Sequence, residues 1–308
     1  MSDLNPPRLR IGVVGTGRVG STLAAALAQA GHTIVAASGV SDASRRRAEA
    51  LRPELGVRPP DEVAAAADLL LLTVPDDELI DLVAGFEKAG VWRAGQIVVH
   101  TSGHHGLDVL GPAEQHGALA LALHPAMTFT GRAEDLDRLH GAVFGVTSLP
   151  DYRPVAEALV LEMRGEPVWV PNSARPLYHA ALSHASNHLV TLICDAVDLL
   201  GEAGVETPTR VLAPLVEAAL ANALLLGDGG LTGPVSRGDV ATVSSHLINL
   251  EFSAPEVLES YVAMARRTAE RAHRARRISA AQHDALRAVL DGVGVEPPPA
   301  GADGDPRP

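Results

Sequence analysis

The segment YHAALSHASNHLV holds three histidines, two serines and an asparagine in thirteen residues, and it contains neither glycine nor proline. Such a segment is expected to be helical, and a helix turns about 100° per residue. His179, Ser183 and Asn187 then form one stripe along the helix, whereas His184 and His188 lie on another face. Because imidazole titrates near neutral pH, we interpret the stripe as candidate catalytic machinery, with His179 as the general acid.

Two other interpretations of this helix remain open. His184 and His188 are four residues apart, a spacing that a metal ion can use, but no glutamate follows His184 as in H-E-x-x-H and no third ligand is evident. We therefore expect no metal and place these two histidines on a solvated or subunit-facing side. The stripe could also consist of polar groups that are hydrogen-bonded inside a helical bundle.

The segment LTGPVSRGD is a candidate for substrate binding. Its glycines and its proline indicate a fixed turn that holds Arg237 and Asp239. An arginine there suits bidentate capture of a carboxylate, so Arg237 is expected to bind substrate and Asp239 to orient it. The alternative is an ion pair between these two residues that only closes the loop. His124, near the end of the apolar run ALALALHP, is a further expected substrate contact.

A glycine-rich segment, GTGRVG, follows the apolar run LRIGVV and opens a helical pattern, which is the context that the dinucleotide fingerprint G-x-G-x-x-G requires. Gly15 permits the tight turn, Gly17 lets the backbone approach a pyrophosphate, and Gly20 allows close packing of the helix on the strand. The N-terminus of the helix attracts phosphates. The predicted cofactor contacts in this segment are Gly15, Thr16, Gly17, Arg18, Val19 and Gly20.

The end of the second predicted strand bears on which dinucleotide is bound. An NAD site is expected to carry an acidic residue there, but the chain continues as ASGVSD before three arginines. Ser38 and Ser41 can donate to a 2′-phosphate and Arg45 can neutralise it, which favours NADP(H). Asp42 keeps the NAD alternative open, because it could bind a ribose hydroxyl. The arginines could also form a solvated helix face.

Apolar runs alternate with helical patterns through the first half of the chain. The runs are LRIGVV, HTIVAAS, ADLLLLTV, GQIVVHTS, ALALALHP and GAVFGVT. This alternation predicts an α/β Rossmann-type doubly wound parallel sheet over residues 1–171. Ligands bind at the carboxyl ends of such strands, so Val74, Pro75 and Ser102 are expected to line the cofactor. His100 and Ser102 are expected to face the nicotinamide.

The second half of the chain has a different character. Helical patterns dominate residues 172–291, which predicts an all-α domain for substrate binding and dimerisation. Residues 292–308 are rich in proline and glycine and are expected to be a disordered tail.

Composition excludes several classes of protein. The formal net charge of −12 argues against a nucleic-acid partner, which would need a basic surface. The single cysteine, Cys194, cannot form an internal disulfide, which indicates a reducing, cytoplasmic setting. No apolar run reaches the roughly 18 residues of a membrane span, and the N-terminus has no apolar targeting segment, so no membrane partner is expected.

Six segments, in order, carry a resemblance to a known family. They are GTGRVGSTLAAALAQAGH, LLLTVPDDEL, VVHTSG, LHPAMTF, YHAALSHASNHLV and LTGPVSRGD. Over roughly residues 9–285 the chain resembles a bacterial family with a Rossmann-like N-terminal half and a C-terminal domain of unknown function, among the 6-phosphogluconate-dehydrogenase-like reductases. Some similar proteins are an alternative ketopantoate reductase that uses NADPH. The resemblance implies an all-α 6-phosphogluconate-dehydrogenase-like second domain and an NADP-dependent oxidoreductase.

The same resemblance assigns two positions on the polar helix. The wider superfamily places a lysine and an asparagine on the first long helix of the second domain. The asparagine carries over to Asn187, but Ser183 stands where the hydroxyisobutyrate-type pattern has its lysine. The only lysine of this chain, Lys88, lies in the nucleotide-binding half. A histidine is therefore expected to replace the lysine as proton donor.

These observations together predict hydride transfer from NADPH to the carbonyl of a small carboxylate-bearing 2-oxo acid, ketopantoate being one candidate. His179 would protonate the alkoxide, and Asn187, with Ser183 beside it, would bind the oxygen. Two alternatives are an NADP reductase that acts on an imine or a flavin-like carrier, and a non-catalytic NADP(H) sensor. The largely apolar helices of the second half suggest a homodimer.

Overall fold

The computed structural model describes residues 8–51 and 56–292. The tail predicted for residues 292–308 lies outside this range, apart from Gly292. The chain divides into two compact units, Met1–Ser186 and Asn187–Pro308. The division falls beyond the boundary expected at residue 171, because the first turns of the following long helix pack with the sheet unit.

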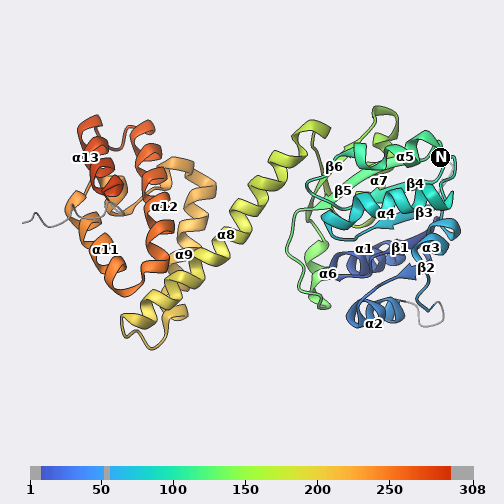
Figure 1. Ribbon diagram of the computed structural model, residues 1–308, viewed down its shortest axis with the longest axis horizontal. Helices are drawn as coiled ribbons and strands as arrows, with labels where there is room; N and C mark the ends of the chain where they lie inside the picture. Colours follow the sequence, from blue (N-terminus) through green and yellow to red (C-terminus); the bar gives the residue numbers. More distant parts are fainter. Residues whose placement is uncertain (1–7, 52–55, 293–308) are drawn as a thin grey trace, which may run out of the picture. The chain divides into compact units, whose positions relative to one another are not determined.

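A single seven-stranded sheet forms the centre of the first unit (Figure 1). Its spatial order is β2-β1-β3-β4-β5-β6-β7, and the order reverses after β1 as in doubly wound folds. Continuous apolar runs become strands that are buried on both faces, such as LLLL in β3. The strands are β1 Arg10–Val14, β2 Thr33–Ser38, β3 Leu69–Leu72, β4 Ile97–His100, β5 Leu119–Pro125, β6 Val143–Ser148 and β7 Glu166–Trp169.

One strand corrects the prediction of a fully parallel sheet. β6 runs antiparallel to β5, and its register places Gly145 opposite His124. The other neighbouring pairs are parallel, including β6 with β7. The segment between β5 and β6 carries only the short helix α6 Glu134–Leu139, which does not carry the chain back across the sheet. The crossover helix α7 Arg153–Glu162 then restores the parallel direction for β7.

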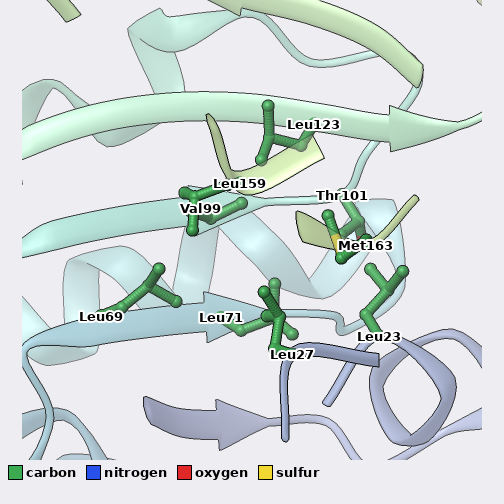
Figure 2. A pocket seen from close by; sticks show the side chains of 9 residues that line it. All are labelled: Leu23, Leu27, Leu69, Leu71, Val99, Thr101, Leu123, Leu159 and Met163. Carbon is green, nitrogen blue, oxygen red and sulfur yellow. The ribbon is translucent and has the colours of Figure 1, made fainter. Parts of the chain in front are cut away.

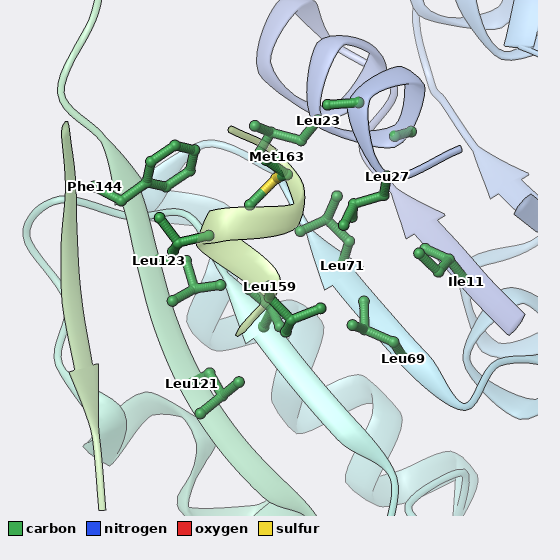
Figure 3. Close-up of a cluster of buried hydrophobic side chains, with 14 of the residues drawn as sticks. Ile11, Leu23, Leu27, Leu69, Leu71, Leu121, Leu123, Phe144, Leu159 and Met163 are labelled. Carbon is green, nitrogen blue, oxygen red and sulfur yellow. The ribbon is translucent and has the colours of Figure 1, made fainter. Parts of the chain in front are cut away.

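Helices α1 Arg18–Gln29 and α7 cover one face of the sheet with a closely packed apolar layer. Figure 3 shows Leu23, Leu27 and Leu159 of these helices, with Met163 just after α7, packed on strand residues. A cavity of only about 10 Å³ lies within this layer. Figure 2 shows the leucine, valine, methionine and threonine side chains that line it. Its size and apolar walls identify it as a packing defect of the core and not as a ligand site.

Helices α3 Pro60–Ala66, α4 Asp76–Ala89 and α5 Gly111–Gln115, with the 3₁₀ turn η2 Leu107–Leu110, cover the other face. Val83 and Phe86 of α4 pack there against Leu70 and Val98 of the strands. Helix α2 Asp42–Leu51 follows β2. With helices on both faces, the predicted Rossmann-type fold is confirmed.

The second unit is helical throughout its described residues. The long helix α8 Arg175–Glu202 begins in the first unit and continues into the second (Figure 1). Val243, Leu247, Ala269 and Leu286 belong to the buried core of the unit. Its other helices are α9 Pro208–Leu226, α10 Gly233–Arg237, α11 Val240–Ser253, α12 Pro255–Arg274 and α13 Ala280–Asp291.

Helix α9 has no buried residue in this chain, although it is rich in leucine. Leu224 and Leu225 are each 81% exposed. The stretch Pro208–Arg237 is long and apolar enough to cross a membrane by length and composition, with a mean hydropathy of 1.5. Inspection of the sequence predicted no such stretch, because scattered polar residues such as Glu217 keep the continuous apolar runs short. An apolar helix that packs against another protein chain has the same composition.

Candidate functional site

The glycine turn between β1 and α1 is shaped by one left-handed residue and one close approach. Gly15 has φ +95°, a conformation that favours glycine. A Cβ at Gly20 would overlap the carbonyl oxygen of Gly15 and Oγ1 of Thr73. Thr73 follows β3 and donates from Oγ1 to the Gly15 carbonyl at 2.5 Å. Glycine is therefore required at both positions by contacts inside the protein.

Gly17 leaves the N-terminus of α1 open. It is the N-cap residue, no side chain caps it, and the first turn of the helix carries no acidic residue. A Cβ at Gly17 would meet nothing within 4 Å. Unpaired backbone N–H groups and the helix dipole favour an anion at this point. These features fit the pyrophosphate of a dinucleotide.

Thr16 differs from its neighbours in the turn because it faces inward. It is fully buried, and its Oγ1 lies 3.1 Å from the carbonyl oxygen of Ser38 and 2.8 Å from that of Ser44. It ties the glycine turn to the end of β2 and to α2. Its side chain therefore shapes the predicted site and is not on the wall of the cleft.

A cleft of about 520 Å³ lies beside the glycine turn, entirely within the first unit. Its walls come from residues that follow β1, β3 and β4, from the end of β5, and from the first turns of α8. Eight of the predicted site residues line it, which brings the predicted cofactor and substrate contacts together: Gly17, Arg18, Val19, Val74, Pro75, Ser102, His124 and His179. The remaining lining residues are Thr73, Asp76, Thr101, Gly103 and Phe129.

Two imidazoles meet over Gly103 on this wall. A Cβ at Gly103 would come within 2.7 Å of Cδ2 of His179 and 2.9 Å of Nε2 of His124. The two rings lie 5.9 Å apart between centroids. Glycine at this position therefore allows both rings to approach the backbone that follows β4.

Arg175, at the start of α8, lies buried beneath these histidines. Its guanidinium donates to the carbonyl oxygen of Ser102 at 2.5 Å and to Oγ1 of Thr147 at 3.0 Å. Burial lowers the pKa of Arg175 to about 10, so the side chain keeps its positive charge at neutral pH. A buried cation at this end of the sheet raises the free energy of placing a second positive charge nearby.

Besides burial, the positive charge of Arg175 lowers the pKa of two neighbouring histidines. Burial and the positive charge of Arg175, with a further contribution from His179, lower the pKa of His124 to about 4. Burial and Arg175 lower the pKa of His100 to about 3. Both rings are therefore uncharged at neutral pH. His100 was expected to face the nicotinamide, but it is fully buried and its Nε2 lies 3.1 Å from the Gly106 carbonyl oxygen.

Tyr178 connects His124 to β6. Its hydroxyl lies 3.0 Å from Nδ1 of His124, and the two rings are nearly perpendicular with centroids 5.6 Å apart. The hydroxyl sits against Gly145, where a Cβ would overlap it. Burial raises the pKa of Tyr178, so the phenol keeps its proton at neutral pH.

The loop that carries Phe129 into the cleft is held by a buried carboxylate. Asp135 accepts hydrogen bonds from the Thr130 N–H and hydroxyl and, at 2.6 Å, from the Gly131 N–H. Burial alone would raise the pKa of Asp135, but these hydrogen bonds outweigh it and lower that pKa. Arg18 donates to the Phe129 carbonyl oxygen at 3.3 Å, which ties the loop to the start of α1.

A second hollow, of about 460 Å³, lies at the carboxyl end of β2. Two cations, Arg45 and Arg58, line it together with Ser38, and this set suits a phosphate on the ribose. Arg45 is 3.9 Å from Asp42 in an exposed ion pair. The hydroxyl of Ser41 accepts from the Ser44 N–H at 3.1 Å at the start of α2, and it is not among the residues that line the hollow.

The other predicted substrate contacts lie elsewhere. Ser183 is half-buried and does not line the cleft, and Asn187 is exposed at the start of the second unit. Arg237 is exposed in the second unit. Asp239 is the N-cap of α11 and accepts from the Thr242 N–H and hydroxyl, which lowers the pKa of Asp239.

Sequence reasoning missed four residues of the site: Arg58, Phe129, Arg175 and Tyr178. Tyr178 and Phe129 stand inside segments that carry the family resemblance, so those segments held a usable signal. Arg175 and Arg58 carry no motif, and only the folded structure shows where their charges lie.

A pair of alanine substitutions separates the two kinds of glycine in the turn. Gly17→Ala is expected to leave the melting temperature within about 2 °C, because its Cβ meets nothing in the protein. It should weaken NADPH binding roughly 10-fold or more by occupying the space over the helix N-terminus. Gly20→Ala is expected to cost about 1–3 kcal/mol of stability through overlap with Gly15 and Thr73. Thermal unfolding and NADPH titration measure both effects; tight binding by Gly17→Ala would contradict the assignment of this turn.

Comparisons with known proteins agree with this architecture. Residues 1–125 match the family model of the Rossmann-like domain, and residues 142–268 match that of DUF2520, a domain of unknown function. No curated protein matches the sequence.

Several solved structures share the fold at low sequence identity. A candidate NADP oxidoreductase from Bacteroides fragilis has a TM-score of 0.71 at 22% identity, over 85% of this chain and 98% of that one. An imine reductase from Pseudomonas sp. has a TM-score of 0.58 at 19% identity, over 92% and 93% of the two chains. A reductive aminase from Aspergillus terreus, solved with NADPH and ethyl levulinate, has a TM-score of 0.56 at 19% identity, over 93% and 95%. The chain therefore carries a match to the Rossmann-like domain followed by a match to DUF2520, and it shares the fold of these solved structures.

Proposed function

We propose that this protein is an NADPH-dependent oxidoreductase that reduces a small carbonyl or imine substrate. The observation that carries the proposal is one cleft that unites an uncapped, glycine-lined helix N-terminus with two imidazoles. Gly17 and Arg18 line one part of this cleft, and His124 and His179 line another. A phosphate site beside groups that can donate protons is the arrangement that a dinucleotide-dependent reduction needs.

The division of labour follows from the environments of the two histidines. NADPH, when bound, supplies the hydride. His124, uncharged beside the buried Arg175, serves as a hydrogen-bond donor to the substrate oxygen or nitrogen. His179, which lies on the same wall of the cleft, supplies the proton that the reduced substrate requires. Phe129 and Val74 provide the apolar part of the lining.

One candidate substrate is a small 2-oxo acid, with ketopantoate as an example through the family resemblance. Arg18 lines the cleft and is its one permanently charged cation among the described residues. It lies beside the glycine turn, where it is expected to serve the cofactor. The substrate roles of Ser183, Asn187, Arg237 and Asp239 stay predictions.

A second candidate, imine reduction, has its own support. The part of the cleft lined by His124 and His179 carries no arginine or lysine among its described residues, so it offers no strong partner for a carboxylate. Two of the similar structures are an imine reductase and a reductive aminase. A neutral imine or ketone suits these walls better than the carboxylate of a 2-oxo acid would.

Turnover of NADPH tests the proposal directly. The full-length protein, mixed with NADPH and separate panels of 2-oxo acids and cyclic imines, is expected to oxidise NADPH with members of one panel. His179→Ala should then lower kcat roughly 100-fold or more, because the proton donor is lost. The matched control is His116→Ala, which removes an exposed imidazole paired with Glu87. Tight NADPH binding without turnover on either panel would instead support an NADP(H) sensor.

The two arginines of the second hollow are expected to set the preference for NADPH over NADH. Arg45→Ala and Arg58→Ala should each weaken NADPH binding roughly 10-fold and leave NADH binding nearly unchanged, since only NADPH carries the extra phosphate. Arg46→Ala, on the same helix but outside the hollow, is the control. Equal loss of both dinucleotides would show that these side chains do not read the phosphate.

We further propose that the protein is a homodimer. Helices α8 and α9 expose Leu189, Val190, Leu220 and Leu224 within the second unit. Acidic residues such as Glu217 share these helices; lipid would exclude such charges, whereas the rim of a subunit interface can hydrate them.

Sedimentation equilibrium is expected to give twice the mass of the chain, 32.0 kDa. Leu224→Glu should shift the equilibrium toward the monomer, because a charge would be buried in the interface. Glu217→Gln, a nearby change that adds no charge, is the control. A monomer at every accessible concentration, or a protein that partitions into vesicles, would contradict a second copy as the covering partner.

A further inference from the structure

The first turn of α8 places two residues near His124, and neither has a direct role in the proposed reaction. The hydroxyl of Tyr178 touches Nδ1 of His124, and the buried Arg175 donates to the carbonyl oxygen of Gly145, the residue opposite His124 in the sheet. We propose that Tyr178 and Arg175 are positioning residues: Tyr178 holds His124 in the tautomer with its proton on Nε2, and Arg175 keeps the ring uncharged. Resting on the proposed function, this arrangement presents Nε2–H to the substrate atom that hydride transfer makes more basic.

The direction of the hydrogen bond between Tyr178 and His124 follows from the chemistry of its two groups. A phenol hydroxyl is a donor, and the ring nitrogen of a neutral imidazole that carries no proton is an acceptor. Burial keeps the proton on the phenol, so we infer that Tyr178 directs this proton toward Nδ1 of His124, 3.0 Å away. Gly145 admits this geometry because a Cβ there would displace the hydroxyl.

The tautomer of His124 follows from this direction. A neutral imidazole carries one N–H and one acceptor nitrogen. When Nδ1 accepts from Tyr178, the proton must reside on Nε2. Nε2 is the atom that approaches Gly103, and His124 and Gly103 both line the cleft. The donor therefore belongs to the wall that the substrate would face.

Arg175 acts on the charge of His124 and not on its orientation. Its Nη1 and Nη2 donate to Gly145, Thr147 and Ser102, so the cation cannot swing away. A protonated His124 would place a second buried positive charge beside it. The titratable groups that face His124 are Arg175, Tyr178 and His179 from α8, His100 from β4 and Asp76 from α4. Among them only Asp76 favours the protonated ring, and it is outweighed.

The opposite tautomer makes a distinct and checkable alternative. If Nδ1–H of His124 donated to the phenol oxygen, Nε2 would be a bare acceptor. It could then receive a proton from a substrate but could not stabilise a developing negative charge. The two arrangements have the same heavy-atom geometry, so a measurement of the proton position decides between them.

Nitrogen NMR of the full-length protein, labelled with 15N-histidine, reads this proton directly. His124 is assigned by the signals lost in His124→Gln. The wild-type protein at pH 7 is expected to show the Nε2–H tautomer of His124, and Tyr178→Phe a mixture of both tautomers. The control, Tyr261→Phe, removes the hydroxyl of the other tyrosine–histidine pair, with His246 at 2.8 Å, and should leave the His124 signals unchanged. An Nδ1–H tautomer in the wild type, or no change in Tyr178→Phe, would overturn the role of Tyr178.

The charge effect is measured by titrating His124 in the same spectra. The wild-type ring is expected to protonate only near its pKa of about 4. Arg175→Lys should keep this low pKa. Arg175→Met should raise it only part of the way toward the ordinary value near 6.5, because burial, the larger cause, remains. If Arg175→Met does not fold, a wild-type pKa near 6.5 would still overturn the role of Arg175, because neither burial nor the cation would then act on the ring.

Activity separates positioning from the proposed function itself. Tyr178→Phe is expected to lower kcat about 5- to 10-fold, the size of one hydrogen bond, with little change in KM. The NMR outcomes need no turnover, so they stand even if neither substrate panel reacts. If Tyr178→Phe changes the tautomer of His124 as expected but neither substrate panel reacts, the proposed oxidoreductase activity is rejected. The positioning roles of Tyr178 and Arg175 would still stand.

Discussion

The buried guanidinium of Arg175 is the interaction on which the rest of the site depends. A charge in this position is tolerated only when its donors are matched by acceptors, and here Ser102, Gly145 and Thr147 supply them. These acceptors come from the turn after β4 and from β6. The cation therefore fastens the start of α8 across two separate parts of the sheet edge, and it biases the charge of every ring packed near it.

The antiparallel strand β6 is part of the same construction. Because β6 runs against β5, its register sets Gly145 opposite His124, the residue near the end of β5 that reaches the cleft. A larger residue at that position would displace the Tyr178 hydroxyl. The antiparallel direction of β6 thus places a glycine where Tyr178 needs room beside His124. Gly103 plays the equivalent part on the other side, where two imidazoles approach the backbone.

Much of the fold could be predicted from the sequence because its signals are local. The GTGRVG turn sits between a strand and a helix as predicted, and each apolar run became a strand. The direction of β6 could not be read, since apolar periodicity is the same in both directions. His100 was misplaced for a related reason: its position near the end of a strand was visible, but its burial was not. The charge of Arg175 acts through space, so no spacing rule could have assigned it to His124.

The site contains no lysine, and its charged and proton-carrying groups are separate side chains. A lysine can both carry a positive charge and give up a proton, whereas here these tasks fall to different side chains. Arg175 supplies a charge that it cannot release, since its pKa stays near 10 even when buried. Burial and that fixed charge keep His124 uncharged at neutral pH, so in the proposed reaction His124 donates a hydrogen bond, and the proton comes from His179 on the same cleft. In this protein the separation begins with one arginine that no solvent reaches.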